Sequence, residues 1–205
     1  MKIVTVAVLV GCLGCGGIEV PAPGTDPGVD SQPDGGAPST GVPAKAATDG
    51  GMLFPNLTLQ GLRSAADMAA PVAVSTWDYY DPDGLQYDLL HVMAIFLWCP
   101  HCNNETTDLS TIAAWQAEHR VAVLQIALQG YSSSSPTWAE IQKWASDHNV
   151  AFPVVIDGQG AQLSQSFKFD GVPFNIVVNP RTMEVMETDV GEVGSVQAYE
   201  QKFLN

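Results

Sequence analysis

Positive charge is scarce in this sequence. Its 205 residues include eight Lys and Arg against twenty-two Asp and Glu, so the formal net charge at pH 7 is −14. A protein with this excess of acid repels phosphate backbones and anionic lipid surfaces. The composition therefore argues against nucleic acid as a partner.

Cysteine is scarce as well, and long apolar runs are missing. The four cysteines form two close pairs, Cys12 with Cys15 and Cys99 with Cys102, instead of being scattered as in a small disulfide-stapled domain. No pair of histidines accompanies them, so we expect no structural zinc site. The apolar run near the N-terminus is far shorter than the roughly 20 residues that a membrane-spanning helix needs.

What is present is enough to build one globular domain. Hydrophobic residues make up 46% of the chain and charged residues 15%, which is typical of a chain that buries a core. A length of 205 residues accommodates one such domain with additional segments and is short for two.

The first twelve residues are typical of a secretory signal. One Lys precedes the apolar run at 3–10, and a glycine and Cys12 follow it. The LVGC sequence at 9–12 resembles the bacterial lipoprotein signal, in which the cysteine becomes the lipid-carrying N-terminus. We expect a signal peptide over residues 1–12 and a lipid at Cys12; the alternative is an ordinary cleaved signal. Cys15 has no assigned role.

The next segment, 13–51, is rich in Pro, Gly, Asp, Ser and Thr and has almost no large apolar residue. Such a composition cannot bury enough surface to offset the entropy of ordering the chain, so we expect a disordered spacer between lipid and domain. A low-complexity tail that binds a partner is the alternative. The folded domain is then expected over residues 52–205.

Hydrophobic patterns within the domain predict strands and helices. The run at 91–98 is apolar almost throughout, as expected of a central strand covered on both faces. The predicted strands are 72–77, 91–98, 121–128, 150–156, 174–178 and 183–189, and the segment 52–59 is expected to be an edge strand or an extended entry segment. The predicted helices are 103–119, 138–148, 161–169 and 195–204. This order predicts an α/β fold with a central mixed β-sheet flanked by helices.

The residues that carry chemistry follow the predicted central strand. Trp98, Cys99, Pro100, His101 and Cys102 lie where that strand ends and a helix begins. The free N–H groups and the positive dipole end of a helix N-terminus favour the thiolate of Cys99 over its thiol. Pro100 suits the first helical turn, and His101 can donate a hydrogen bond or a positive charge to the same sulfur. Cys102 lies one turn along, where it can close a disulfide.

This WCPHC motif after a strand resembles the thioredoxin-like oxidoreductases, and its CPHC part resembles the periplasmic DsbA-type thiol oxidases. The GVPF sequence at 171–174 is similar to the cis-proline loop of that superfamily. The resemblance implies a cis bond at Val172-Pro173, a loop that faces the cysteines, and backbone pairing of Val172 with substrate polypeptide. An ordinary trans turn is the alternative. Trp98 is expected either to shape the substrate groove or to serve packing alone.

Other features are similar to the TlpA-like, membrane-associated branch of the superfamily. They are the FPNLTLQG sequence at 54–61, Glu105 three residues after Cys102, and the FPVVID sequence at 152–157. The resemblance implies that Glu105 helps proton transfer from Cys102; the alternative is an exposed carboxylate favoured by the helix dipole. Met93 stands where thioredoxins carry a buried aspartate, so a proton relay through that position is not expected.

The resemblance implies a thiol-disulfide oxidoreductase of thioredoxin-like fold in the bacterial periplasm or at the cell surface. Protein thiols or disulfides are the expected substrates, an upstream redox partner is expected, and no cofactor is required beyond the Cys99–Cys102 disulfide. The DsbA-like motif favours an oxidase and the TlpA-like features favour a reductase, so the direction stays open. Two other hypotheses use the same cysteines: a module that binds or delivers a soft metal such as copper, and a purely structural disulfide.

Three further histidines stand apart from this motif. His91, His119 and His148 are isolated in the sequence, and their spacing is not that of a metal site. We expect them at the surface or at strand ends.

Overall fold

The computed structural model describes residues 51–64 and 67–204. The predicted signal peptide at 1–12, the lipidation of Cys12 and all but the last residue of the predicted spacer at 13–51 lie outside the described residues and remain predictions. Within the described ranges, no helix is long and apolar enough to cross a membrane.

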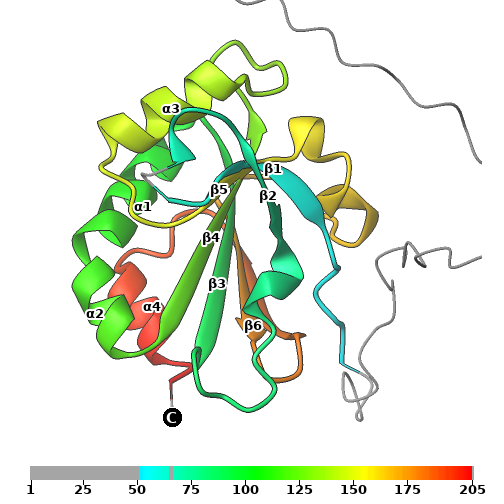
Figure 1. The fold of residues 1–205 in the computed structure, drawn as a ribbon, viewed down its shortest axis with the longest axis vertical. Coiled ribbons are helices and arrows are strands. Elements are labelled where there is room, and N and C mark those ends of the chain that lie inside the picture. Colours follow the sequence, from blue (N-terminus) through cyan, green and yellow to red (C-terminus); the bar gives the residue numbers. More distant parts are fainter. Residues whose placement is uncertain (1–50, 65–66, 205) are drawn as a thin grey trace, which may run out of the picture. The chain divides into compact units, whose positions relative to one another are not determined.

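A seven-stranded mixed sheet forms the centre of the domain (Figure 1). Its strands lie in the order β2-β1-β5-β4-β3-β6-β7. Strand β4 is parallel to β3 and β5, and the other neighbours are antiparallel. The bounds are β1 Thr58–Leu62, β2 Val72–Ser75, β3 Leu89–Phe96, β4 Val121–Gln129, β5 Val154–Ile156, β6 Phe174–Asn179 and β7 Glu184–Val190. The predicted mixed sheet is confirmed.

Both faces of the sheet are covered. Helices α1 Pro100–Thr111, α2 Ala113–Glu118, α3 Trp138–Asp147 and α4 Val196–Gln201 lie on one side (Figure 1). Their buried residues Leu109, Trp144 and Tyr199 belong to one core cluster. The second cluster contains Phe54 and Leu163 and is closed by the entering chain and by the short 3-10 turns η2 Thr76–Tyr79, η3 Gly158–Gly160 and η4 Leu163–Gln165.

The two central strands are buried almost from end to end. All residues of β3 except Phe96 and all of β4 except Gln129 are buried, as the continuous apolar run predicted for a strand covered on both faces. Each fully buried Leu or Ile side chain contributes roughly 1.5–3 kcal/mol. These strands therefore form a rigid base for the turn that follows β3.

Some predicted elements differ from the structure. The helix predicted at 103–119 is two helices, because the backbone leaves helical geometry at Ile112 (φ −98°, ψ 8°). The helix predicted at 161–169 is only the turn η4, since the Asp157 carboxylate accepts the N–H groups of Gln162 and Leu163 and holds a loop. The segment 52–59, expected to be an edge strand or an extended entry segment, joins the sheet as a strand only from Thr58, because the residues before it bond elsewhere, with the Leu57 N–H donated to the Thr76 hydroxyl.

Candidate active site

The turn after β3 brings Cys99 to the N-cap of α1. The Cys99 N–H donates to the Phe96 carbonyl at 3.0 Å, and Pro100 follows in the first helical turn, where its missing N–H leaves no partner unsatisfied. The Cys99 Sγ accepts the N–H of Cys102 at 3.3 Å. The sulfur therefore occupies the place that a serine or aspartate oxygen takes at other helix starts.

The two cysteines differ in access, and burial changes the acidity of Cys102. Both are free thiols; Cys99 is 6% exposed and Cys102 is 0% exposed. Burial raises the pKa of the Cys102 thiol far above its ordinary value, and its hydrogen bond with Cys99 raises it further. Of the pair, Cys99 is the sulfur that a substrate can reach, and Cys102 needs a base before it can act as a nucleophile.

The GVPF loop lies against the reachable sulfur. The Val172-Pro173 bond is cis, as predicted, and the Cys99 thiol donates to the Val172 carbonyl at 3.7 Å. The two motifs meet because β3 and β6 are antiparallel neighbours in the sheet. Pro173 is buried and Val172 is half-buried. The sequence-predicted residues Cys99, Val172 and Pro173 are thus brought together.

Glu105 is inside the protein beside Cys102. Its side chain lies on the buried face of α1 and is 1% exposed, so the alternative of an exposed helix-start carboxylate is wrong. The carboxylate Oε2 accepts the N–H of Val193 at 3.2 Å, and Oε1 has no hydrogen-bond partner. Burial raises the pKa of Glu105 to about 6, while the charge of His91 and the Val193 N–H oppose the rise.

His101 points away from the sulfur. Its ring Nδ1 lies 2.8 Å from a carboxylate oxygen of Glu192, and its side chain is 67% exposed. Among the hydrogen bonds described for the Cys99 sulfur, none comes from His101. The contact with Glu192, which lies 91 positions further along the chain, is a long-range one that the motif alone could not reveal.

Trp98 forms part of the rim of the site. The residue is 46% exposed, its ring packs on Phe96 with centroids 5.3 Å apart, and its Nε1 donates to the Gln129 side chain at 3.1 Å. These contacts fix the ring beside the sulfur while leaving almost half of it open. Trp98 therefore packs against Phe96, and its exposed part is open to contact with a substrate.

Sequence reasoning missed a buried polar cluster on the same face of the sheet. His91 was expected at the surface or at a strand end, but its side chain is completely buried. Its ring contacts Glu200 at 2.8 Å and Asn175 at 2.9 Å, and Gln116 donates to Glu200. Its position within an apolar strand was a usable signal, because a histidine there requires buried partners.

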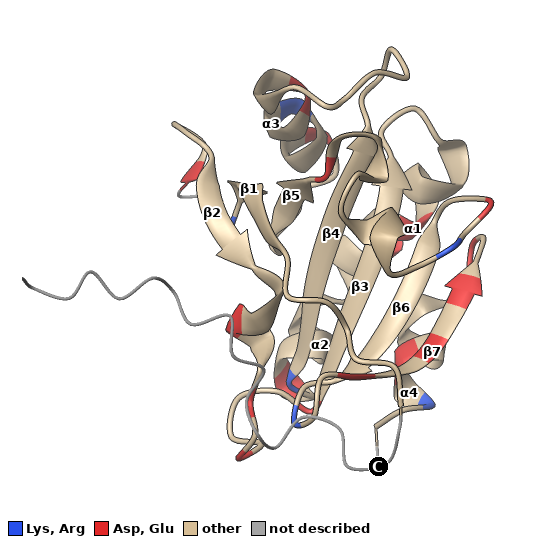
Figure 2. Cartoon of the chain, turned by 90° about the vertical axis from the view of Figure 1, so that its right-hand side faces the viewer, with Lys and Arg blue, Asp and Glu red and all other residues tan. Residues whose placement is uncertain are grey.

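Acidic side chains line the edge of the sheet next to the site. Strand β7 is the last strand in the sheet order, and Glu187 and Asp189 project from it exposed. Figure 2 shows these acidic positions along β7. Glu192, which holds His101, follows in the next loop.

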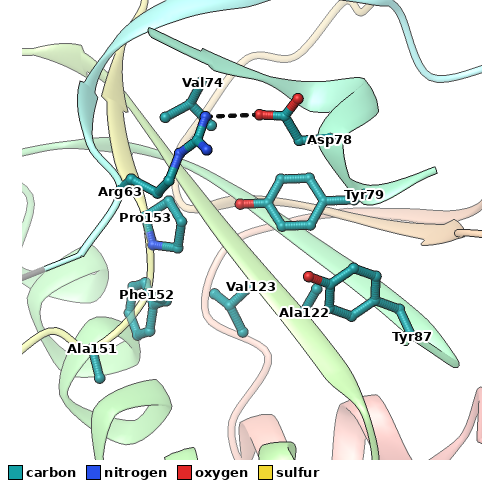
Figure 3. A pocket seen from close by; sticks show the side chains of 10 residues that line it. All are labelled: Arg63, Val74, Asp78, Tyr79, Tyr87, Ala122, Val123, Ala151, Phe152 and Pro153. Carbon is teal, nitrogen blue, oxygen red and sulfur yellow. Dashed lines mark hydrogen bonds and ion pairs between the residues drawn. The ribbon is translucent and has the colours of Figure 1, made fainter. Parts of the chain in front are cut away.

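A separate cavity of about 350 Å³ lies elsewhere in the domain. Figure 3 shows Tyr79 and Tyr87 in its wall, beside the ion pair of Arg63 and Asp78 at 3.0 Å. It reaches the first residues of β4, whereas the cysteine pair follows the end of the parallel strand β3. This cavity does not belong to the cysteine site.

Comparison with known proteins places the domain in a family. A model of the AhpC/TSA family matches residues 64–185, which is more than half of the chain. A search of curated proteins found no match.

Solved structures of similar fold include two bacterial thiol-disulfide proteins and a peroxidoxin. A thioredoxin domain of a thiol-disulfide oxidoreductase from Bacteroides vulgatus is 18% identical with a TM-score of 0.56, covering 76% of this chain and 97% of that one. A thioredoxin-family thiol:disulfide interchange protein from Chlorobium tepidum is 14% identical with a TM-score of 0.56 (77% and 97% covered). The peroxidoxin BcpB from Mycobacterium tuberculosis is 17% identical with a TM-score of 0.51 (75% and 92% covered). These likenesses show a thioredoxin-like fold, as the sequence predicted.

Proposed function

The chain belongs to the AhpC/TSA family, and we propose that it is a thiol-disulfide oxidoreductase that exchanges disulfides with protein substrates through Cys99 and Cys102. The observation that carries this proposal is the position of the Cys99 sulfur. It accepts an N–H group at the start of α1 and lies 3.7 Å from the carbonyl of Val172 in the cis-proline loop. A sulfur held there is the more accessible of the pair, faces a free N–H group at a helix start, and is adjacent to a second thiol.

In the reducing direction the reaction has two displacements. The Cys99 thiolate attacks one sulfur of a substrate disulfide, which forms a mixed disulfide and releases the other substrate sulfur as a thiolate that takes up a proton. The Cys102 thiolate then attacks the Cys99 sulfur, so the internal disulfide forms and the second substrate thiol leaves. The substrate gains two electrons and the cysteine pair loses two; the reverse order oxidises a substrate dithiol.

Glu105 supplies the base that the second displacement requires. The Cys102 thiol is buried and holds its proton tightly, so attack on the mixed disulfide requires proton removal. Glu105, with a pKa of about 6, is mostly a carboxylate at pH 7 and can accept that proton. In the oxidising direction the protonated carboxyl returns it.

Substrate polypeptide binds beside the sulfur along the proline loop. Val172 offers its backbone for pairing with an extended chain, and Trp98 offers an open aromatic surface next to Cys99. Backbone pairing requires an extended chain and does not depend on its side chains, so this arrangement fits many polypeptides that carry a disulfide.

The direction of exchange depends on how strongly the dithiol form is stabilised. His101, which would stabilise a Cys99 thiolate, is paired with Glu192. Within the described residues the sulfur then accepts one hydrogen bond, from the Cys102 N–H. This arrangement favours a reductase. Equilibration with glutathione tests the assignment: a strongly oxidising pair would contradict it.

We propose further that the protein works outside the cytoplasm as a lipoprotein held at a membrane through Cys12. The LVGC sequence at 9–12 and the Pro- and Asp-rich spacer at 13–51 support this. An upstream redox partner would return the cysteine pair to its active form. Fatty-acid labelling in cells should be lost in Cys12→Ala, and labelling that persists would contradict the anchor.

Exchange activity is tested with the two cysteine variants. Reduction of insulin disulfides by the full chain should vanish in Cys99→Ser. Cys102→Ser should instead accumulate mixed disulfides at Cys99, whose identification in cells names the substrates. Activity that survives Cys99→Ser, or a wild-type protein with no exchange at all, would refute the proposal and leave the structural disulfide.

A copper-binding module would use the same two sulfurs. In the described ranges no group of three or more His, Cys, Asp or Glu is placed to hold a metal ion. Binding would therefore rest on two thiolates, one of which comes from the proton-holding Cys102. Micromolar copper binding without any exchange activity would favour this module.

A further inference from the structure

A buried polar cluster contacts Tyr199, which belongs to the same core cluster as Cys99 and Cys102, and the proposed exchange steps do not use it. It consists of His91 from β3, Asn175 from β6, Gln116 from α2 and Glu200 from α4, and none of these residues is more than 4% exposed. A buried ion pair is weak evidence for a stabilising role, because apolar residues of similar volume often serve as well or better. A role in the chemistry of the neighbouring thiols is a better explanation.

The contacts of His91 show that its ring carries a positive charge. Nδ1 lies 2.8 Å from a Glu200 carboxylate oxygen and Nε2 lies 2.9 Å from Asn175 Oδ1. The Asn175 amide orientation follows from its Nδ2, which donates to the Gly191 carbonyl at 3.3 Å. Because both ring nitrogens face acceptors, both carry hydrogen. Burial lowers the pKa of His91, but the hydrogen bond and charge of Glu200, together with Asn175, raise it above its ordinary value.

Glu105 on α1 is held to the cluster by the loop after β7, which bonds Asn175 through Gly191 and Glu105 through Val193. Burial raises the pKa of Glu105 to about 6, and the charge of His91 opposes that rise; Glu105 in turn favours the charged form of His91. Asn175 accepts from His91 and donates to the Gly191 carbonyl, while Glu105 accepts the N–H of Val193, two residues further along the same loop.

Other titratable groups also face Glu105. Cys102 lies on the same helix, Glu192 lies in the loop after β7, and Tyr199 lies on α4. Glu192 opposes the carboxylate form, because its charge has the same sign. Among these groups of the described residues, His91 is the cation, and its charge favours the carboxylate form of Glu105.

We propose that the His91–Glu200 ion pair is a positioning device for the proton exchange of Cys102. The pair holds a fixed positive charge that keeps Glu105 in the carboxylate form, and Asn175 fixes the imidazole by accepting from its Nε2. Glu200 makes this possible because it is the counter-ion that keeps His91 charged in the interior. The inference rests on the proposed function, since it takes Glu105 as the base.

Glu200→Gln tests the device with little change of shape. A neutral amide can donate to Nδ1, so His91 loses its charge while Nε2 still donates to Asn175. The midpoint of the Glu105 titration should rise by about one pH unit, as expected for the loss of a nearby opposite charge. At pH 6 closure of the Cys99–Cys102 disulfide should then slow about fivefold, because the carboxylate fraction falls from about one half to about one tenth.

A second variant and a control make the test specific. His91→Gln removes the cation from the other side of the pair and should shift the midpoint in the same direction. Gln125→Met removes a buried polar side chain that bonds Thr106 and Trp144 and changes no charge. In Gln125→Met the midpoint of the Glu105 titration should equal that of the wild type, even though this variant loses buried hydrogen bonds.

The titration is followed in the full chain by carbon-13 NMR of the glutamate carboxyl groups, with the Glu105 signal assigned by its loss in Glu105→Gln. The rate of disulfide closure is measured over the same pH range. A Glu105 midpoint near 6 in both Glu200→Gln and His91→Gln would overturn the inference, as would a rate profile that does not follow a shifted midpoint. Absence of exchange in the wild type would instead refute the proposed function, and the carboxyl titration would still decide whether His91 acts on Glu105.

Discussion

Replacing Glu105 with Gln should stabilise the protein at neutral pH while slowing its chemistry. Glu105 is 1% exposed, and its Oε1 has no hydrogen-bond partner. Burial raises its pKa from 4.5 to about 6. At about 1.4 kcal/mol per pH unit, this difference corresponds to about 2 kcal/mol of unfolding free energy.

The sign of the effect follows from which state holds the proton more tightly. Between pH 4.5 and about 6 the folded protein keeps the Glu105 proton and the unfolded chain releases it, so stability falls as the pH rises. Below this window the carboxyl is neutral in both states and carries no penalty. The wild type should therefore lose about 2 kcal/mol between about pH 4 and pH 7 that Glu105→Gln does not lose.

Urea unfolding of the full chain, followed by tryptophan fluorescence, measures this difference at several pH values. Other carboxylates titrate in both proteins, so the quantity of interest is the wild-type value subtracted from that of Glu105→Gln. Glu118→Gln, at an exposed position at the end of α2, is the matched control and should show no such trend. In Glu105→Gln, resolution of the mixed disulfide should also slow by about 10² or more at pH 7, because the base is lost. A free-energy difference that stays constant from pH 4 to 7 would refute the reasoning.

Three further changes test other parts of the structure. Glu192→Gln should release His101 to the active-site sulfur and make the pair more oxidising by about 30 mV, which is tenfold in the glutathione equilibrium; an unchanged equilibrium would show that the freed ring does not reach the sulfur. Trp98→Ala should raise KM for polypeptide substrates and leave reaction with glutathione disulfide unchanged, because the ring is 46% exposed at the rim; equal loss with both substrates would contradict a binding role. Gly61→Ala should lower the unfolding free energy by about 3 kcal/mol, since its Cβ would collide with the Val154 carbonyl oxygen, and an unchanged urea midpoint would show that β1 can move away.

The parts of the site that sequence reasoning found are those encoded by short motifs. WCPHC after an apolar run located Cys99 at a strand-to-helix junction, and GVPF located the cis bond at Val172-Pro173. The position of Cys99 follows from the apolar strand before it and the helix after it, whereas the cis bond is what the resemblance to the thioredoxin-like oxidoreductases implied. The mixed sheet followed from the order of the apolar segments.

The parts that it missed depend on partners distant in the chain. His91 is paired with Glu200, 109 positions away, and His101 with Glu192, 91 positions away. No local sequence pattern specifies which glutamate pairs with which histidine, because the packing of α4 and of the loop after β7 determines these contacts. The burial of Glu105 likewise depends on that packing. The sequence alone therefore could not decide between a carboxylate that helps proton transfer from Cys102 and an exposed carboxylate at the helix start.

The acidic edge formed by β7 has a consequence for how copies of this protein meet. Strand edges invite pairing with other chains, and like charges along an edge discourage it. Here Glu187 and Asp189 lie on the edge strand, and Glu192 in the following loop contacts His101 of the active-site motif. Two identical molecules that approach sulfur to sulfur would bring these carboxylates together, so collisions between copies are disfavoured, and this repulsion weakens as salt screens it. The reactive thiol is thereby reserved for unlike partners.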